Sequence, residues 1–118
     1  MRIKVVGPCA SGKSVLVARL RALGRDAHSA AQDHSYVPDM WQRLNPPDLL
    51  IYLDVTLDEA WRRGRSGIGW DQAYLDEEHH RLRHARAHCD LYLPTDGLTE
   101  EQVLQEVLDF LEPASGHE

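Results

Sequence analysis

The sequence has 118 residues, of which 42% are hydrophobic, and carries a formal net charge of −6 at pH 7. This length predicts one globular domain with a single core, which we place at residues 1–112, with a frayed C-terminal tail at 113–118. The acidic balance gives no electrostatic footprint for nucleic-acid binding, and no apolar run approaches the length of a membrane span. Two cysteines, Cys9 and Cys89, do not make a disulfide framework, so a reducing cytoplasm is the expected location.

The first predicted element is a short apolar strand at residues 2–6. Residues 7–14 follow it and read G-P-C-A-S-G-K-S, which fits the phosphate-binding pattern G-x-x-x-x-G-K-S at every fixed position. A helix is predicted at 15–23, and Gly24 is a suitable residue to end it. A strand before and a helix after are the context that this loop requires, so the sequence predicts phosphate or nucleotide binding.

The residue types of the 7–14 loop suit a triphosphate. Gly7 and Gly12 permit turns that a Cβ would hinder and allow a phosphate to approach the backbone. The turn directs backbone N–H groups at one point, and the helix N-terminus adds partial positive charge. Lys13 is expected to reach the β- and γ-phosphates, and Ser14 to offer its hydroxyl to Mg²⁺. We therefore expect ATP, or another nucleoside triphosphate, with Mg²⁺. The predicted nucleotide-binding residues are Gly7, Pro8, Cys9, Ala10, Ser11, Gly12, Lys13, Ser14 and Val15.

Two elements are predicted between the first helix and the middle of the chain. Residues 25–33 form a weak strand candidate, because they lack β-branched side chains. A short helix is expected to begin at Pro38, and residues 45–47 end it. The best strand is 48–55, whose apolar residues on both faces are typical of a buried strand in a parallel sheet.

Four elements are predicted in the second half. A short helix over 57–63, capped by Thr56 or Asp58, precedes a long helix at about 71–88. A last strand is expected at 90–93, and a terminal amphipathic helix opens at 98–101. Strands alternating with helices predict an α/β fold of three layers, with a small, mostly parallel sheet of about four strands.

Two further passages bear on the family. Residues 47–55 read P-D-L-L-I-Y-L-D-V and lead into 58–65, D-E-A-W-R-R-G-R. They are similar to the "P-D-L-x-I-Y-L-D-V … E-x-x-x-x-R" passage of thymidylate-kinase-like and deoxynucleoside-kinase-like enzymes. The last strand running into 95–103 is also similar to the end of these proteins. With its loop, the chain resembles the P-loop NTPase superfamily, and within it the nucleoside and nucleotide kinases. The resemblance implies a P-loop NTPase fold and transfer of the γ-phosphate of ATP to a small molecule such as a nucleoside or nucleotide.

The chain departs from these kinases in length. They commonly run to about 200 residues, and they fit another strand and a substrate-binding insert before the strand that corresponds to 48–55. The missing insert favours a second hypothesis, a nucleotide-binding module without transfer activity, and a third, a slow ATPase that acts with a partner. A partner chain, as in a homodimer, is one way to complete the site. The sequence does not identify the acceptor.

Magnesium requires an acid at the end of a neighbouring strand in addition to Ser14. Two residues compete for this role. Asp33 follows a poor strand, but its order along the chain better matches the kinase group. Asp54 ends the best strand. The sequence favours Asp33 and leaves both open as Mg²⁺ ligands.

Arginines follow the helix predicted over 57–63. Arg62, Arg63 and Arg65 lie where the resembling kinases carry lid arginines, and planar guanidinium groups suit the spread charge of a transferring phosphoryl group. Glycines 64, 67 and 69 suggest a loop that closes over the phosphates. We expect Arg62 or Arg65 to act in catalysis with Lys13 and Asp33; a solvated helix end is the alternative.

Thiol and imidazole groups give two weaker signals. Cys9 lies near a helix N-terminus, which is expected to lower the pKa of its thiol. His80, His84 and His88 recur every fourth residue and would share a helix face before Cys89. That spacing could hold a transition metal, but a solvated face is the favoured interpretation.

Overall fold

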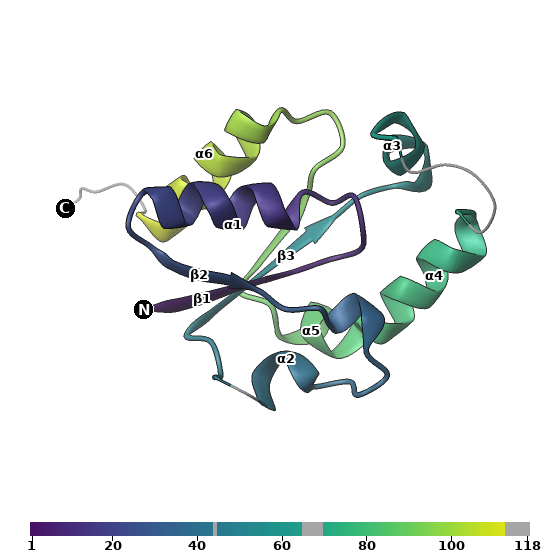
Figure 1. The fold of residues 1–118 in the computed structure, drawn as a ribbon, viewed down its shortest axis with the longest axis horizontal. Helices are drawn as coiled ribbons and strands as arrows, with labels where there is room; N and C mark the ends of the chain where they lie inside the picture. Colours follow the sequence, from purple (N-terminus) through teal and green to yellow (C-terminus); the bar gives the residue numbers. More distant parts are fainter. Residues whose placement is uncertain (44, 65–69, 113–118) are drawn as a thin grey trace.

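A computed structural model describes residues 1–43, 45–64 and 70–112 of the chain (Figure 1). It is an α/β structure with a small parallel sheet, which confirms this part of the predicted fold. The elements are β1 (Arg2–Val6), α1 (Lys13–Ala22), β2 (Asp26–Ser29), the 3₁₀ helix η1 (Gln32–His34), α2 (Met40–Arg43), β3 (Leu49–Asp54), α3 (Leu57–Arg62), α4 (Gln72–Arg81), α5 (Arg83–His88), β4 (Leu91–Pro94) and α6 (Glu100–Leu111).

The sheet is parallel throughout, with strand order β2-β1-β3-β4 in the described residues. Strand β1 is central, and its residue Ile3 is in register with Ala27 on one side and Leu49 on the other. Because all strands run the same way, the segments that follow them meet at one edge of the sheet. The 7–14 loop therefore lies beside the segments after β2, β3 and β4.

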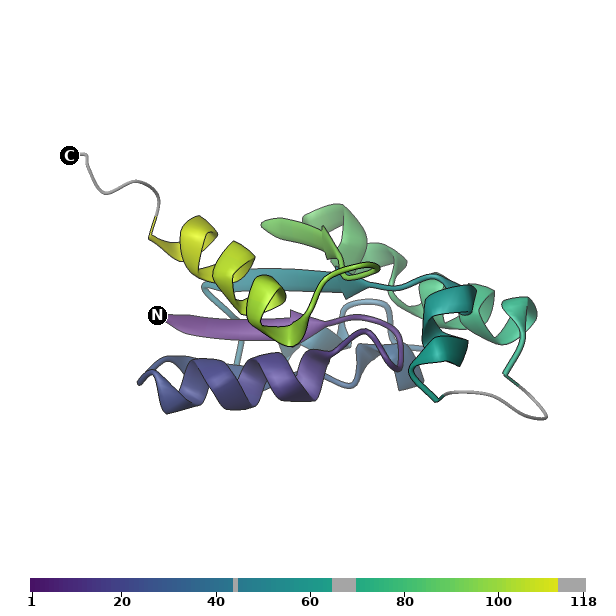
Figure 2. The same ribbon diagram turned by 90° about the horizontal axis from the view of Figure 1, so that it is seen from above.

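One face of the sheet packs against α1 and α6, which lie side by side over the strands (Figure 2). Alternate strand residues point to this face, among them Ile3 and Val5 of β1 and Ile51 and Leu53 of β3. All four are at most 1% exposed. This is the larger of two apolar clusters, and it fixes the start of α1 against the sheet.

The other face packs against α2 and α5 (Figure 1). Its strand residues are those of the opposite parity, such as Leu50 and Tyr52, and Trp41 and Leu82 cover them. Lys4 shares this parity and is 9% exposed; its Nζ donates to the backbone carbonyl of Trp41 at 2.8 Å. Helices thus cover both faces, an arrangement compatible with three layers.

The prediction of one long helix at 71–88 is wrong in one respect, because this segment forms two helices. Helix α4 ends at Arg81 and α5 begins at Arg83, with Leu82 between them at φ −95° and ψ 0°. The backbone N–H of Leu82 donates to the carbonyls of both Glu78 and His79, which tightens the turn. Leu82 itself is fully buried against the sheet, so the change of direction keeps both helices on the core.

Other elements lie close to their predicted bounds. The weak candidate at 25–33 divides into the short strand β2 and the turn η1, which carries Asp33. Thr56 caps α3, and its Oγ1 accepts from the backbone N–H of Glu59. No helix in 1–43, 45–64 or 70–112 is long and apolar enough to cross a membrane. The predicted tail at 113–118 lies outside the described residues.

Candidate functional site

The 7–14 loop packs directly on the end of β3. Gly7 has φ 154°, and a Cβ at this position would lie 2.1 Å from the carbonyl oxygen of Leu53. Gly12 also has a positive φ of 100°, but a Cβ there would meet no atom within 4 Å. Gly7 is therefore required by close packing, whereas Gly12 is required by the backbone turn alone.

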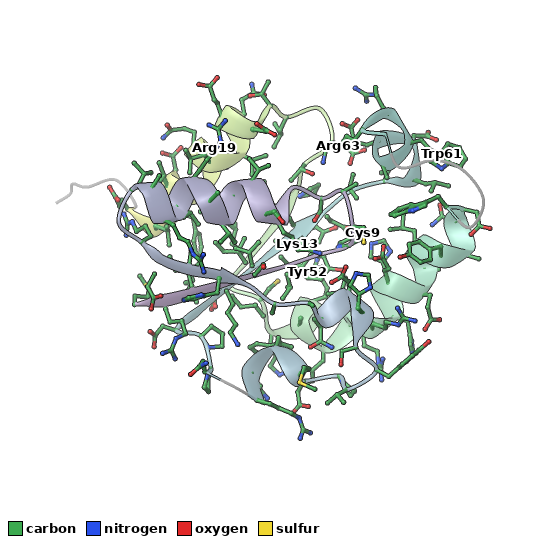
Figure 3. All side chains as sticks on the ribbon, in the orientation of Figure 1. Cys9, Lys13, Arg19, Tyr52, Trp61 and Arg63 are labelled. Atoms are coloured by element: carbon green, nitrogen blue, oxygen red, sulfur yellow. The ribbon has the colours of Figure 1, made fainter. Side chains whose placement is uncertain are left out.

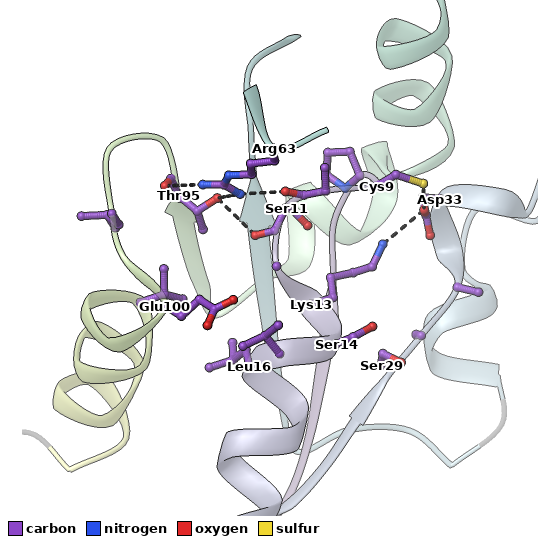
Figure 4. A pocket seen from close by; sticks show the side chains of 18 of the residues that line it. Cys9, Ser11, Lys13, Ser14, Leu16, Ser29, Asp33, Arg63, Thr95 and Glu100 are labelled. Atoms are coloured by element: carbon purple, nitrogen blue, oxygen red, sulfur yellow. Dashed lines mark hydrogen bonds and ion pairs between the residues drawn. The ribbon is translucent and has the colours of Figure 1, made fainter. Parts of the chain in front are cut away.

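Lys13 folds back over the loop toward the end of β2 (Figure 4). Its Nζ donates to the backbone carbonyl of Gly7 and lies 3.2 Å from Oδ2 of Asp33. The Asp33 side chain is only 2% exposed, and its second oxygen, Oδ1, has no hydrogen-bond partner. Ser14, at the start of α1, is exposed and lines the same pocket. The structure thus brings Lys13, Ser14 and Asp33 to one cavity.

This cavity has a volume of about 710 Å³ and extends to both sides of the α1 N-terminus. On one side it is lined by the segment after β2, which includes Asp33 and His34. On the other it is lined by the segment between β4 and α6, including Leu98 and Val103. The first side combines Asp33 and His34 with the small residues 29–31, and the second combines Leu98 and Val103 with polar residues such as Glu100.

Of the two predicted arginines that the structure describes, Arg63 reaches this cavity and Arg62 does not (Figures 3 and 4). Its guanidinium donates to the carbonyl of Ala10 at 2.7 Å and to the carbonyl of Thr95 at 2.8 Å. Arg62, in contrast, has a side chain that is 74% exposed and pairs with Glu59. Arg65 lies outside the described residues.

Asp54 lies at a second, smaller cavity of about 340 Å³, which Ser14 does not line. Its Oδ1 is 2.8 Å from Nε2 of His79, and its Oδ2 accepts from the hydroxyl of Tyr92 at 2.6 Å. Burial alone would raise the pKa of Asp54, but the hydrogen bonds from His79 and Tyr92 outweigh it and hold that pKa below its usual value. The same contact raises the pKa of His79. Asp54 thus belongs to an ion pair on the α4 side of the sheet.

The thiol of Cys9 does not have the predicted acidity. Burial, together with a hydrogen bond to Glu78, raises its pKa to about 12. The predicted lowering is therefore wrong, because burial of the thiol raises the pKa most, and the neighbouring carboxylates of Glu78 and Asp33 add to it.

Three residues of the site were not singled out from the sequence. Thr95 is buried, and its Oγ1 lies 3.1 Å from the carbonyl of Ser11 and 3.0 Å from that of Asp54, so it joins the loop to β3 and β4. Glu78 of α4 is fully buried beside Cys9. His34 follows Asp33 directly and lines the larger cavity. Adjacency to Asp33 could have indicated His34, but no pattern pointed to Glu78 or Thr95.

In the part of the chain that the structure describes, the histidines at four-residue spacing do not belong to the group of residues that could hold a metal. His84 and His88 stack with ring centroids 4.1 Å apart, and Nδ1 of His84 accepts from the indole N–H of Trp41 at 3.0 Å. His80 is exposed, on the far side of the helix break, where it contacts Arg83. His80 and His88 are exposed, as the favoured solvated face predicts, whereas His84 is half-buried against Trp41.

The chain matches no protein-family model, and a search of curated proteins finds no match. The kinase-like family therefore remains an expectation from the sequence motifs.

Proposed function

We propose that the chain is a P-loop protein of three-layer α/β/α architecture that binds ATP with Mg²⁺ and transfers the γ-phosphate to a small molecule. One observation carries the proposal. The G-x-x-x-x-G-K-S loop lies at the end of the central strand, with Lys13 and Asp33 3.2 Å apart in a cavity of about 710 Å³ at the N-terminus of α1. Such a loop end concentrates backbone N–H groups and positive charge, which suits a triphosphate.

Each proposed role rests on a feature of the site. Lys13 is 15% exposed at its side chain, so it needs only to turn from Asp33 to meet the β- and γ-phosphates. The exposed hydroxyl of Ser14 and the unpartnered Oδ1 of Asp33 are oxygen ligands of the kind that Mg²⁺ prefers. Asp33 is favoured over Asp54, since Asp54 is held by His79 and Tyr92 at another cavity.

The two sides of the cavity suggest how the substrates divide. A nucleoside would contact the apolar side chains of Leu98 and Val103, and an acceptor would approach from the side of Asp33 and His34. Arg63 lies beside the loop, where a guanidinium can neutralise phosphate charge.

A second candidate function is nucleotide binding without transfer, alone or with a partner chain. The hydrogen bonds that Arg63 already makes favour this second function. Among the described residues, Arg63 is the arginine that lines the cavity, and its guanidinium is already bound to Ala10, Thr95 and Glu59. Transfer would require Arg63 to leave these partners, or Arg65 to approach.

Calorimetric titration with ATP and Mg²⁺ in the presence of a chelator selective for zinc tests the proposal. We expect saturable binding that Lys13→Ala weakens at least tenfold, whereas Arg83→Ala, an exposed change on α5 with contacts to His80, leaves it unchanged. Absence of binding by the folded wild type would contradict the proposal. ADP formation that depends on an added nucleoside, nucleotide or small alcohol distinguishes transfer from binding alone.

A further inference from the structure

Four potential metal ligands of different chemistry meet beside the 7–14 loop. They are the thiol of Cys9, the carboxylates of Asp33 and Glu78, and the imidazole of His34, and one donor atom from each lies within 4.8 Å of all the others. They come from the loop, the turn η1 and helix α4, and Figure 4 shows Cys9 and Asp33 side by side. In the described ranges of the chain, this is the one group of three or more such residues.

The spacing of three donors matches a tetrahedral zinc site. With Zn–S of about 2.3 Å and Zn–N and Zn–O of about 2.0 Å, tetrahedral angles place sulfur about 3.5 Å from each other donor and nitrogen about 3.3 Å from oxygen. The structure has Cys9 Sγ 3.5 Å from Asp33 Oδ2 and 3.7 Å from His34 Nε2, and His34 Nε2 3.3 Å from Asp33 Oδ2. One cation can therefore contact these three atoms with little movement.

Buried carboxylates supply an independent indication. Glu78 is 0% exposed and Asp33 is 1% exposed, and each has one oxygen with no hydrogen-bond partner. Such atoms are costly to bury unless a hydrogen-bond donor or a cation satisfies them. The backbone N–H of Cys9 donates to the other oxygen of Glu78 at 3.4 Å, which holds this carboxylate against the cluster. Glu78 is thus in position to act as the fourth ligand.

We propose that Cys9, Asp33, His34 and Glu78 form a binding site for a transition-metal dication of the zinc class. Thiolate and imidazole donors favour Zn²⁺ over Mg²⁺, which prefers oxygen alone. Access is open, since the His34 side chain is 55% exposed and lines the larger cavity together with Cys9 and Asp33.

Metal binding would bring a second cation to Asp33. Oδ2 of Asp33 is paired with Lys13 in the structure, and the metal adds a second positive charge to that carboxylate. The Cys9 thiol loses its proton to solvent as the sulfur–metal bond forms, so one proton is released for each metal bound. The site does not depend on nucleotide, and its test needs none.

Cobalt(II) is the probe, because its thiolate complexes absorb in the near ultraviolet. We expect titration of the full chain with Co²⁺, without nucleotide, to saturate at one ion per chain with a thiolate-to-cobalt charge-transfer band. Equimolar Zn²⁺ should remove the band. Cys9→Ser should abolish it, and His34→Gln, a change of an exposed side chain, should weaken binding at least tenfold.

Cys89→Ser is the matched control, since Cys89 follows α5 and bonds to Arg86 rather than to the cluster. It should keep the band and the affinity. The proposal is overturned if the folded wild type binds no Co²⁺ saturably, if the band persists in Cys9→Ser, or if Cys89→Ser loses it. Circular dichroism of each variant verifies that it is folded. Because ATP binding is measured with zinc chelated, the two proposals can fail separately.

Discussion

Asp33 and Asp54 form an instructive pair. Each follows or ends a strand that flanks β1, and the two therefore lie at the same edge of the sheet. Asp54 has both oxygens satisfied, by His79 and by Tyr92. Asp33 is more deeply buried, yet Oδ1 has no partner, while Oδ2 is surrounded by Lys13, Cys9 and His34.

The difference separates a structural carboxylate from a candidate ligand-binding one. Buried polar atoms in folded proteins are nearly always hydrogen-bonded, so an unpartnered oxygen has the capacity to accept from a water molecule or to bind a cation. Position at the edge of the sheet alone would not distinguish the two acids. Their hydrogen-bond partners do.

The largest expected effect comes from Gly7, which packs on the residue before Asp54 and so connects the two regions. In Gly7→Ala, the new Cβ would lie 2.1 Å from the carbonyl oxygen of Leu53. The loop and the end of β3 must separate, and we expect the free energy of unfolding to fall by about 3 kcal/mol. Urea denaturation measures this loss.

Gly12→Ala is the control for Gly7→Ala. Gly12 has φ 100° but open space around its Cβ position, so only backbone strain is added, about 1 kcal/mol. Equal losses of unfolding free energy in the two variants would show that the close contact between Gly7 and β3 adds nothing to the cost of a Cβ in the loop.

Replacing each aspartate by asparagine tests directly whether Asp33 and Asp54 have different roles. Asp33→Asn should weaken Mg²⁺-dependent ATP binding about tenfold or more, because the oxygen ligand loses its charge. Asp54→Asn should leave that binding within about twofold but lower the free energy of unfolding by about 2 kcal/mol, since His79 and Tyr92 lose a charged acceptor. Titration and urea denaturation of both variants give the four values, and the reverse pattern would assign the Mg²⁺ role to Asp54.

The adjacent Arg62 and Arg63 allow a second comparison, of a residue that contacts the loop with one that does not. Arg63→Ala removes donors to the carbonyls of Ala10 and Thr95 and should lower the free energy of unfolding by about 1 to 2 kcal/mol. Arg62→Ala removes a 74% exposed guanidinium from the buried carboxylate of Glu59, which keeps its ion pair with Arg63, and should cost at most about 1 kcal/mol. Thermal denaturation ranks the stability of the two variants. A larger loss of stability for Arg62→Ala would contradict the conclusion that Arg63 holds the loop.

The smallest expected effect is the pH dependence of the stability that the ion pair between Asp54 and His79 contributes. The pKa of His79 is raised by its bond to Asp54, so this contribution to stability is complete below the unfolded value of about 6.5. It is lost as pH rises through the raised pKa. The pKa of Asp54 is lowered, so its contribution is lost at the acid end, as pH falls through that lowered value.

Unfolding of wild type and His79→Gln, compared between about pH 6 and about pH 8, isolates the histidine. Only the wild type should lose stability over this interval, by about 0.5 kcal/mol, because water screens a ring that is 36% exposed. An unchanged difference between the two proteins would show that the ion pair does not titrate as described.

Local patterns account for much of the fold. The 7–14 loop, the apolar strand β3 and the capped terminal helix α6 each carry a signal within a few residues, and all three lie close to their predicted bounds. The break at Leu82 has no such signal, because it results from packing against the sheet. The alternation of side chains along β3 indicates on which face of the sheet Asp54 lies. Asp54 shares a face with Leu50 and Tyr52, opposite the face that α1 covers.

The sequence placed Lys13, Ser14 and Asp33 at the site, Asp33 by its order along the chain, but it gave no indication of Glu78 or Thr95. Lys13 and Ser14 follow from the motif. Glu78 approaches Cys9 from the middle of α4, and Arg63 meets Thr95 across the end of the sheet. Such pairs are set by the packing of separate elements, so no spacing in the chain indicates them.

The parallel sheet also constrains how the protein folds. Every strand pairs with a strand that follows only after intervening helices or turns, so the contacts that define the sheet close long loops and form slowly. Gly7 can rest on the carbonyl of Leu53 only after β1 and β3 have aligned. The nascent chain therefore carries its loop sequence from the start, but the loop acquires its shape only once β3, more than forty residues later, has been synthesised and paired with β1.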